Sequence, residues 1–393
     1  MFARARNMLV DVHTHVYLPR YANLMRARTK APRIVPSKDG KGESLIVLEG
    51  RDSGRPVGGQ YWDRAEKLAF MDKHGIDISI VSTANPWLDF LTAADAPPLA
   101  RELNDDLEAY CATGPSISSE SLPGTLQRFY GFGLLPLLPS VPTSEITAII
   151  EQIGKLPHLK GVIMGTRGIG KGLDDPELEP IWAAIEEKGL VIFLHPHYGV
   201  PDELFGDVEN GHVLPLALGF PFETAIATAR FILSGTFDRH PGLRLMLAHS
   251  GGALPILSSR LASCIEHDPV VARRLKHDAR HYLGMLYYDA VAYGAPELTM
   301  ASAAAGRGPN YAASSRQGVK TEGIEGWSAL GSRRMMFGTD HPFFPPVPGV
   351  ADTEAKWQSV TENLAAIQAV PGWSETDKEG VRSGNALKIF GLA

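Results

Sequence analysis

Apolar, β-rich runs alternate with helical patterns along the chain, and this alternation is the feature that most constrains the fold. The eight runs lie at residues 9–12, 76–81, 129–135, 161–164, 190–194, 243–247, 285–288 and 335–337. The helical patterns between them lie at residues 64–73, 98–110, 144–154, 176–188, 222–233 and 254–266. Eight strand–helix alternations predict an α/β fold, a (β/α)8 TIM barrel. An open doubly wound sheet is the alternative, because its strands have the same periodicity.

The length of 393 residues suits one barrel with loop insertions, since such barrels run from about 200 to over 400 residues. We therefore expect residues 1–393 to form a single barrel domain. Three loop-like segments are interpreted as insertions, at about residues 16–60, 198–221 and 301–326. The last is rich in Ala, Gly and Ser, and we expect it to be mobile.

Composition excludes several classes of function. Hydrophobic residues make up 44% of the chain and charged residues 21%, and the net charge is −6, so there is no basic field for nucleic acid or an anionic membrane. We expect no stretch long enough to span a membrane. Cys111 and Cys264 are the only cysteines, which excludes a disulfide framework and indicates a reducing compartment, the cytoplasm. Small-molecule chemistry is favoured.

The first apolar run ends in two histidines that are one residue apart, His13 and His15. On a strand, residues i and i+2 point to the same side. Two imidazoles that project together from the end of a strand can occupy adjacent positions on one metal ion. A solvated turn that contains two histidines is the alternative interpretation of this motif alone.

Further polar residues follow the other predicted strands, where barrel enzymes carry their reactive groups. They are Asn85 after the second strand, His195 and His197 after the fifth, His249 after the sixth, and Asp340 after the eighth. His13, His15, one of the pair His195 and His197, and Asp340 together suit zinc or another divalent first-row ion. The fourth strand ends in Met164, Gly165 and Thr166, without the lysine that bridges two metals in binuclear hydrolases on this barrel. We therefore expect one metal.

Longer motifs show a resemblance to a known family. The strings DVHTH, FLHPHYG, LAHSGG, FGTDHPFFPP and GNALKIFGL resemble the amidohydrolase-2 family, in particular the metal-dependent decarboxylases related to aminocarboxymuconate-semialdehyde decarboxylase. TANPWLDF, GTRGIGKGLDDPEL and GHVLPLALGFPFET resemble more narrowly the fungal uracil-5-carboxylate (iso-orotate) decarboxylases. The resemblance spans nearly the whole chain and implies a barrel of the amidohydrolase type.

The resemblance also implies roles for single residues. The implied metal ligands are His13, His15, His195 and Asp340, and the implied substrate contacts are Arg55, Asn85, His249 and Phe343. His197 would then be a structural histidine. The implied cofactor is Zn²⁺, with Mn²⁺ or another divalent ion as alternatives, and no organic cofactor is expected because decarboxylation of this kind involves no redox change.

The expected activity is metal-dependent, non-oxidative decarboxylation of a cyclic acid with an oxygen beside the carboxylate. Uracil-5-carboxylate, converted to uracil and CO₂ in pyrimidine salvage, is the first substrate considered, and Asp340 is the expected proton donor with His249 assisting. A salicylate-like acid such as 6-methylsalicylate or resorcylate is an alternative substrate. Hydrolysis of a lactone or amide at one metal is an alternative reaction, and a barrel that only binds a ligand is a third hypothesis. We expect a homodimer or homotetramer with small-molecule partners only.

Overall fold

A computed structural model describes residues 8–38, 40–48, 54–118, 124–208, 210–312, 323–346 and 356–393. Eight parallel strands form one sheet in the order β1-β5-β8-β9-β10-β11-β12-β13. Their bounds are β1 Val10–Val16, β5 Ile78–Thr83, β8 Phe129–Leu134, β9 Leu159–Gly165, β10 Val191–His195, β11 Arg244–Leu247, β12 Tyr287–Asp289 and β13 Met335–Met336. Each of the eight predicted strands is present, with ends that differ by a few residues.

The sheet closes on itself, so the open doubly wound alternative is wrong. The amide of Val12 in β1 donates to the carbonyl of Phe337, just past β13, at 3.0 Å. Two residues further on, Thr14 forms a parallel bridge with His341. First and last strands therefore meet, and the predicted (β/α)8 barrel is confirmed.

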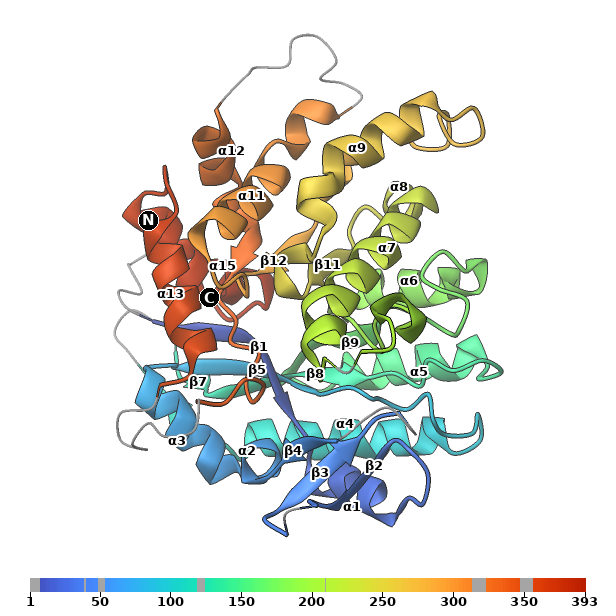
Figure 1. Cartoon of the computed structure of the whole chain (residues 1–393), viewed down its shortest axis with the longest axis vertical. Coiled ribbons are helices and arrows are strands. Elements are labelled where there is room, and N and C mark those ends of the chain that lie inside the picture. Colours follow the sequence, from blue (N-terminus) through green and yellow to red (C-terminus); the bar gives the residue numbers. More distant parts are fainter. Residues whose placement is uncertain are drawn as a thin grey trace.

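Helices surround the barrel (Figure 1). They are α1 Pro19–Ala27, α2 Gly59–Trp62, α3 Arg64–His74, α4 Ala96–Ala112, α5 Thr143–Ile153, α6 Glu179–Lys188, α7 Phe220–Leu233, α8 Thr236–Arg239, α9 Leu254–His267, α10 Ala279–Leu283, α11 Ala295–Gly306, α12 Ile324–Gly331, α13 Gln358–Ala369, α14 Glu375–Glu379 and α15 Asn385–Ile389. Local sequence sets the ends of several. Asp63 caps α3 by accepting from the amide of Ala65 at 2.7 Å, and Gly75 and Gly189 end α3 and α6 in the left-handed conformation.

The first insertion is more ordered than the expected loop. Residues 16–60 contain α1 and a three-stranded antiparallel sheet of β2 (Arg33–Pro36), β3 (Glu43–Ile46) and β4 (Arg55–Val57). The strands are only three or four residues long, too short for a periodicity that sequence inspection recognises. A second small sheet pairs β6 (Ser116–Ile117) with β7 (Leu126–Gln127).

The expectation of a loop over residues 301–326 is also wrong for the part described. Residues 301–306 continue α11, and α12 begins at Ile324, whereas residues 313–322 lie outside the described part of the chain. A side-chain carbon on Gly306 would lie 1.9 Å from the carbonyl oxygen of Trp327, and one on Gly331 would lie 1.8 Å from that of Ser302. The small residues therefore mark two closely packed helices, because only glycine fits at these crossing points.

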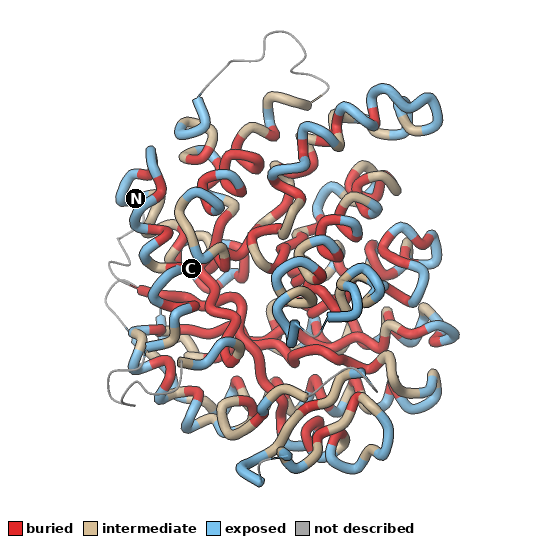
Figure 2. The backbone as a smooth tube through the Cα atoms, in the orientation of Figure 1, coloured by how far each residue is buried: buried red, intermediate tan, exposed pale blue. Residues whose placement is uncertain are grey.

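The core consists of the strands and the inner faces of the helices, which are buried throughout (Figure 2). The second insertion, residues 198–221, contains the short helix Asp202–Phe205 and a π-helical turn, Pro215–Gly219, that runs directly into α7. The π-helical turn and α7 together form a 19-residue helical stretch, Pro215–Leu233. By length and composition alone this stretch could cross a membrane, although 44% of its apolar window is buried. The expectation that no stretch is long enough to span a membrane did not account for this helix. It is weak support for a membrane span, because a core helix passes the same test.

Candidate active site

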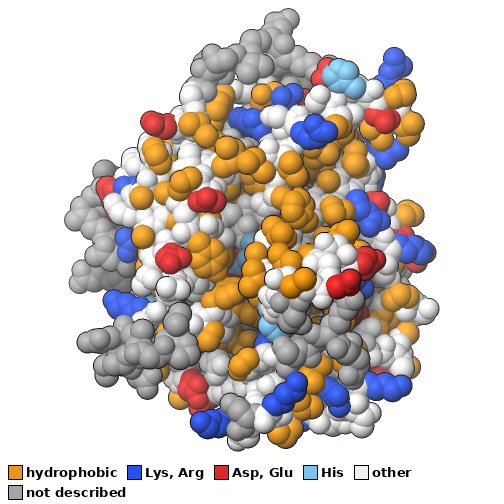
Figure 3. Space-filling model, viewed as in Figure 1, with side chains coloured by type: hydrophobic (Ala, Val, Ile, Leu, Met, Phe, Trp, Pro, Cys, Tyr) orange, Lys and Arg blue, Asp and Glu red, His pale blue; other side chains and the backbone are white. Residues whose placement is uncertain are grey.

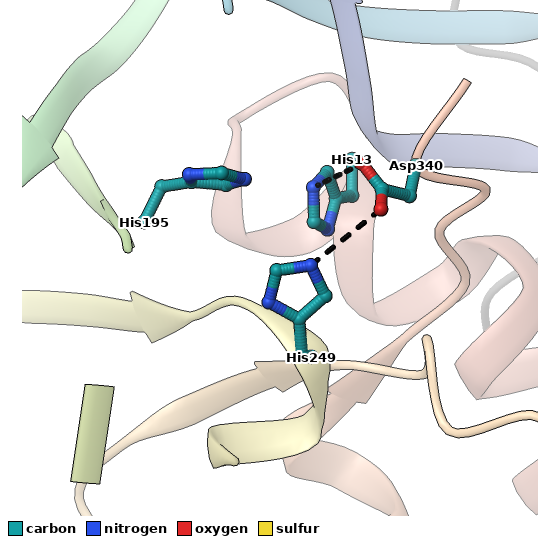
Figure 4. A group of neighbouring side chains, drawn as sticks. All are labelled: His13, His195, His249 and Asp340. Atoms are coloured by element: carbon teal, nitrogen blue, oxygen red, sulfur yellow. Dashed lines mark ion pairs between the residues drawn. The ribbon is translucent and has the colours of Figure 1, made fainter. Parts of the chain in front are cut away.

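Four of the predicted site residues meet at the carboxyl-terminal end of the barrel. His13 and His15 project from β1, His195 is the last residue of β10, and Asp340 follows β13. The Nε2 atoms of His13 and His15 lie 3.1 Å apart, and both lie within 3.4 Å of Oδ1 of Asp340. His195 faces the same point, with its ring centre 5.0 Å from that of His15. Figure 4 shows His13, His195, His249 and Asp340 turned toward one another.

The second nitrogen of each of the three clustered imidazole rings is held by the protein. Nδ1 of His13 lies 2.5 Å from Oδ2 of Asp289, Nδ1 of His15 lies 3.0 Å from the hydroxyl of Ser82, and Nδ1 of His195 donates to the Pro196 carbonyl at 2.7 Å. A proton on each Nδ1 leaves the lone pair on Nε2. Three lone pairs and a carboxylate therefore converge.

These groups fit a divalent cation. The Nε2 atoms of His13 and His15 lie only 3.1 Å apart, so either a proton on His13 or a metal ion must lie between them, because two lone pairs would repel each other at this distance. Nε2 of His195 is buried and has no hydrogen-bond partner among the described residues, which is costly for a polar atom. A cation would satisfy all three nitrogens, and imidazole nitrogens and carboxylate oxygens are common ligands of zinc.

The charge states agree with this arrangement. Burial lowers the pKa of His15 to about 4 and that of His195 well below its usual value, so both rings are neutral near pH 7. Burial also opposes the charged form of His13, but Asp340 and Asp289 outweigh it and raise the pKa to about 10. Burial would raise the pKa of Asp340, yet the neighbouring histidines lower it well below its usual range. In the metal-free protein His13 is therefore the one charged ring of the three, and a metal ion would have to displace the proton from its Nε2.

His249 and Asp340 occupy strained backbone positions. Nε2 of His249 lies 3.6 Å from Oδ2 of Asp340, and His249, Ser250 and Asp340 all adopt positive φ angles, of 54°, 52° and 56°. Non-glycine residues rarely adopt this conformation, and where they do they concentrate at functional sites. The four ligand-type atoms of His13, His195, His249 and Asp340 lie within 4.8 Å of one another.

The structure places His197 outside this cluster. Its Nε2 lies 3.2 Å from Oδ1 of Asp89, and its ring packs on Tyr198 and Trp87. Glu223 of α7 holds the loop by accepting from the amides of His197 and Gly199 at 2.9 and 2.7 Å. Of the two histidines after β10, His195 therefore faces the cluster and His197 faces away.

The end of β9 has no room for a bridging side chain. A side-chain carbon on Gly165 would lie 2.6 Å from the Trp87 ring and 2.8 Å from Nδ1 of His197. The absent lysine is thus explained by packing, because Trp87 and His197 fill the space in which it would lie.

Arg55 and Phe343 lie together beside the cluster. Nη2 of Arg55 donates to the hydroxyl of Tyr17 at 2.9 Å and to the carbonyl of Asn85 at 3.1 Å. The guanidinium carbon lies 4.3 Å from the centre of the Phe343 ring, a cation–π contact. The same ring meets His15 edge-on, with ring centres 5.6 Å apart. Arg55 and Phe343 therefore extend the site away from the histidines.

Asn85 presents an unsatisfied acceptor. Its Nδ2 donates to the carbonyl of His197 at 2.7 Å, which fixes the orientation of the amide because a carbonyl can only accept. Its Oδ1 is buried and has no partner among the described residues. Such an atom requires a donor from a ligand or a water molecule.

Two adjoining cavities open beside these residues, with volumes of about 720 and 1030 Å³. Arg55 and Asn85 line the first, and His195, His249 and Asp340 line the second. The residues common to both walls are His212, Leu216, Phe220, Phe343 and Phe344. Arg55 and Asn85 therefore lie in the wall of one cavity, and His195, His249 and Asp340 lie in the wall of the cavity that adjoins it.

Sequence reasoning missed three residues of this site. Asp289 ends β12, and the rule that reactive groups follow barrel strands would have found it had the seventh strand been inspected. Tyr61 lies in α2, where its ring stacks on Tyr17 with ring centres 4.9 Å apart, and it lines the first cavity. Burial raises the pKa of Tyr61, so its hydroxyl is a donor at neutral pH. Ser82, inside β5, carried no sequence signal.

Comparison with known proteins defines the class. The amidohydrolase family model (Amidohydro_2) matches residues 10–392, so the chain belongs to this family. A 2-amino-3-carboxymuconate-6-semialdehyde decarboxylase of Dictyostelium discoideum is 25% identical over 98% of this chain and 92% of its own length. The chain is an enzyme of the decarboxylase branch of the family.

Two solved structures are similar to this chain, and the second of them shows the fold alone. The isoorotate decarboxylase (IDCase) of Metarhizium anisopliae, in its apo form, is 38% identical, covers 100% of this chain and 99% of its own, and superposes with a TM-score of 0.84. A dihydroxybenzoic acid decarboxylase of Polaromonas, with bound manganese and 2-nitroresorcinol, is 20% identical over 98% and 97% of the chains, with a TM-score of 0.67. The predicted resemblance to the iso-orotate decarboxylases is confirmed.

Proposed function

We propose that the protein decarboxylates uracil-5-carboxylate to uracil and CO₂, as a step of pyrimidine salvage in the cytoplasm. The observation that carries this proposal is the buried, unpartnered Oδ1 of Asn85 in the cavity wall that also holds Arg55. A pyrimidine ring offers an N–H donor next to a carbonyl acceptor, which matches the amide oxygen of Asn85 beside the donors of Arg55 and Tyr61. A salicylate whose single hydroxyl faces the metal offers no donor at that edge.

We assign the metal to His13, His15, His195 and Asp340, and we propose one zinc ion per chain, with manganese as the alternative. When bound, the cation offsets the negative charge of the substrate carboxylate and of the adjacent ring oxygen. Arg55 adds charge-assisted hydrogen bonds, and Phe343 covers one face of the ring. These contacts fix the ring before the reaction begins.

Asp340 delivers the proton in this proposal. Because its pKa lies well below the usual range, it is a carboxylate in the resting site and must first take a proton from His249. It protonates the ring carbon that bears the carboxylate, the bond from this carbon to the carboxylate carbon then breaks, and its electron pair returns to the ring as CO₂ leaves. One proton enters and one CO₂ departs, so no oxidant or reductant is required. His249, whose Nε2 lies 3.6 Å from Oδ2 of Asp340, is placed to return a proton to Asp340 for the next turnover.

Parallel assays of candidate acids test this function. Purified, zinc-loaded protein is incubated with uracil-5-carboxylate, 6-methylsalicylate and 2,6-dihydroxybenzoate, and both CO₂ and the ring product are measured. We expect the highest kcat/KM for uracil-5-carboxylate. A preference for a hydroxybenzoate would replace the substrate but keep the reaction, whereas ring opening of a lactone or amide without CO₂ would overturn decarboxylation itself.

We further propose that the chain forms a homodimer or homotetramer through an apolar face. Leu218, Phe222 and Ile226 are exposed along the turn before α7 and along α7 itself, and Ile256 and Leu257 are exposed on α9. Hydrophobic side chains cover much of this face (Figure 3), and large exposed apolar patches are typical of protein interfaces. Light scattering should give a multiple of 42.5 kDa, and Ile226→Glu should lower it. A monomeric native protein would contradict self-association.

A further inference from the structure

Asp289 is a fully buried carboxylate at the end of β12, outside the set of proposed metal ligands. Each of its oxygens accepts two hydrogen bonds. Oδ2 accepts from Nδ1 of His13 at 2.5 Å and from the amide of His249 at 2.9 Å. Oδ1 accepts from the amides of Ser250 and Val291 at 2.8 and 3.1 Å. One oxygen therefore contacts both histidines that flank Asp340.

We propose that Asp289 is a positioning residue that sets His13 and His249 relative to Asp340. This inference rests on the proposed function, because it assigns His13 to the metal and His249 to the proton path. Asp289 itself touches neither the metal position nor the cavity: it does not line either cavity. Its action on the reaction is through the two histidines.

The first half of the proposal concerns the tautomer of His13. A carboxylate is acceptor-only, so it requires the proton of His13 on Nδ1 and leaves the lone pair on Nε2, which faces His15 and Asp340. Partners of this kind on the far nitrogen of a ligating histidine orient the ring and raise its basicity. Without the carboxylate, the proton can move to Nε2, where it would point into the metal site.

The second half concerns the backbone of His249. His249 and Ser250 adopt φ angles of 54° and 52°, which are unfavourable for both residues. Their two amides point at the Asp289 carboxylate, and the Ser250 hydroxyl donates to the Asp289 carbonyl at 3.0 Å. Asp289 thus holds the strained turn that aims His249 at Asp340, which lies 3.6 Å from it. One side chain links the metal ligand to the proton path.

Asp289→Asn tests the proposal with little change in volume. The amide oxygen can still accept from Ser250 and Val291, but the amide nitrogen then faces His13 and the amide of His249 as a donor. We expect zinc affinity of the metal-free protein, measured by chelator competition, to fall roughly 10- to 100-fold. At saturating zinc, kcat with the preferred substrate should also fall, because His249 is displaced, whereas KM should change little.

Tyr288→Phe is the matched control. It removes a buried hydrogen bond, from the Tyr288 hydroxyl to the Leu283 carbonyl at 2.9 Å, one residue earlier in the same strand. The phenylalanine ring keeps the packing of Tyr288 against Gly251, so the turn that carries His249 retains this contact. We expect it to lower the melting temperature of the metal-free protein but to leave zinc affinity within about twofold of native. If Asp289 had only a structural role, Asp289→Asn would likewise lower the melting temperature and leave zinc affinity almost unchanged.

Two results would overturn the positioning role. One is native zinc affinity in Asp289→Asn, and the other is a loss of zinc affinity in Tyr288→Phe equal to that in Asp289→Asn. Should the asparagine variant fail to fold, Asp289→Glu keeps the charge but moves the oxygens by one methylene, and the same loss of affinity is expected. Because zinc affinity is measured without substrate, this measurement tests the positioning role of Asp289 even if the native protein does not accept uracil-5-carboxylate.

Discussion

At the scale of single residues, the orientation of each clustered histidine is set by a hydrogen bond on its far ring nitrogen. The side of each imidazole that faces away from the cluster bonds to a different partner: Asp289 for His13, Ser82 for His15 and the Pro196 carbonyl for His195. These partners come from β12, β5 and the chain after β10. The direction of the three lone pairs is therefore set by the barrel frame and not by the ion that they would bind.

The two histidines after β10 should behave differently when removed. The ring centre of His195 lies 5.0 Å from that of His15, whereas Nε2 of His197 lies 3.2 Å from Oδ1 of Asp89. We expect His195→Ala to lose both metal and activity, and His197→Ala to keep most of its metal, as measured by elemental analysis of the dialysed proteins. The reverse result would mean that the ligand assignment is wrong by one residue pair.

Asp340 is expected to separate binding from chemistry. Asp340→Asn keeps the size and one ligating oxygen but cannot deliver a carboxylic proton. Metal and substrate should still bind, more weakly, while turnover falls roughly 10²- to 10⁴-fold, as is typical when acid–base catalysis is lost. In heavy water, the native enzyme should place one deuterium on the ring carbon that carried the carboxylate. Near-native turnover of the variant at full metal occupancy would move the acid role to His249.

At the scale of elements, a buried lysine contacts both β1 and the segment after β13, where the barrel closes. Lys67 of α3 is 1% exposed, and its ammonium group contacts the Thr14 hydroxyl, the His15 carbonyl at 3.3 Å and Nδ1 of His341 at 2.7 Å. Burial lowers its pKa to about 7. One side chain from a helix thereby joins the two segments that carry His15 and Asp340.

Replacing Lys67 should lower the free energy of unfolding. Lys67→Met keeps the length of the side chain but leaves buried acceptors in Thr14, His15 and His341 without their donor, so we expect a loss of about 1–3 kcal/mol in the free energy of unfolding. Urea denaturation measures it. Lys155→Met, at an exposed position after α5, should change stability by less than about 0.5 kcal/mol. Equal stabilities for native and Lys67→Met proteins would contradict this role of Lys67.

Much of this element-level organisation was predictable, for a physical reason. Strands buried on both faces are continuous apolar runs, so all eight were found, and His13, His15, His195 and Asp340 followed from their positions at strand ends. Strand-end position alone did not separate His195 from His197, and the choice of His195 came from the family resemblance. The small sheet that carries Arg55 and the helices α11 and α12 were not found, because very short strands and Ala/Gly-rich helices lack a clear hydrophobic period. The contacts of Asp289 depend on spatial neighbours and have no local signal.

At the scale of the whole molecule, the four proposed ligands come from segments far apart in the sequence. His13 and Asp340 are separated by almost the length of the chain. His195 ends β10, which lies in the middle of the strand order, far from both β1 and β13. A cation bound to all of them would connect β1, β10 and the segment after β13. Because such a site does not exist in the unfolded chain, metal binding adds directly to the stability of the folded state.

Metal content and metal removal should therefore report on the whole fold. We expect about one divalent ion per chain, because four ligands converge and packing at Gly165 leaves no place for a bridging lysine. Free zinc at about a thousand times its dissociation constant would stabilise the folded state by about 4 kcal/mol. Chelation should accordingly lower the melting temperature by several degrees, and added zinc should restore it. Two ions per chain would overturn the single-metal assignment, and identical melting curves with and without metal would show that the histidine cluster does not bind a cation tightly.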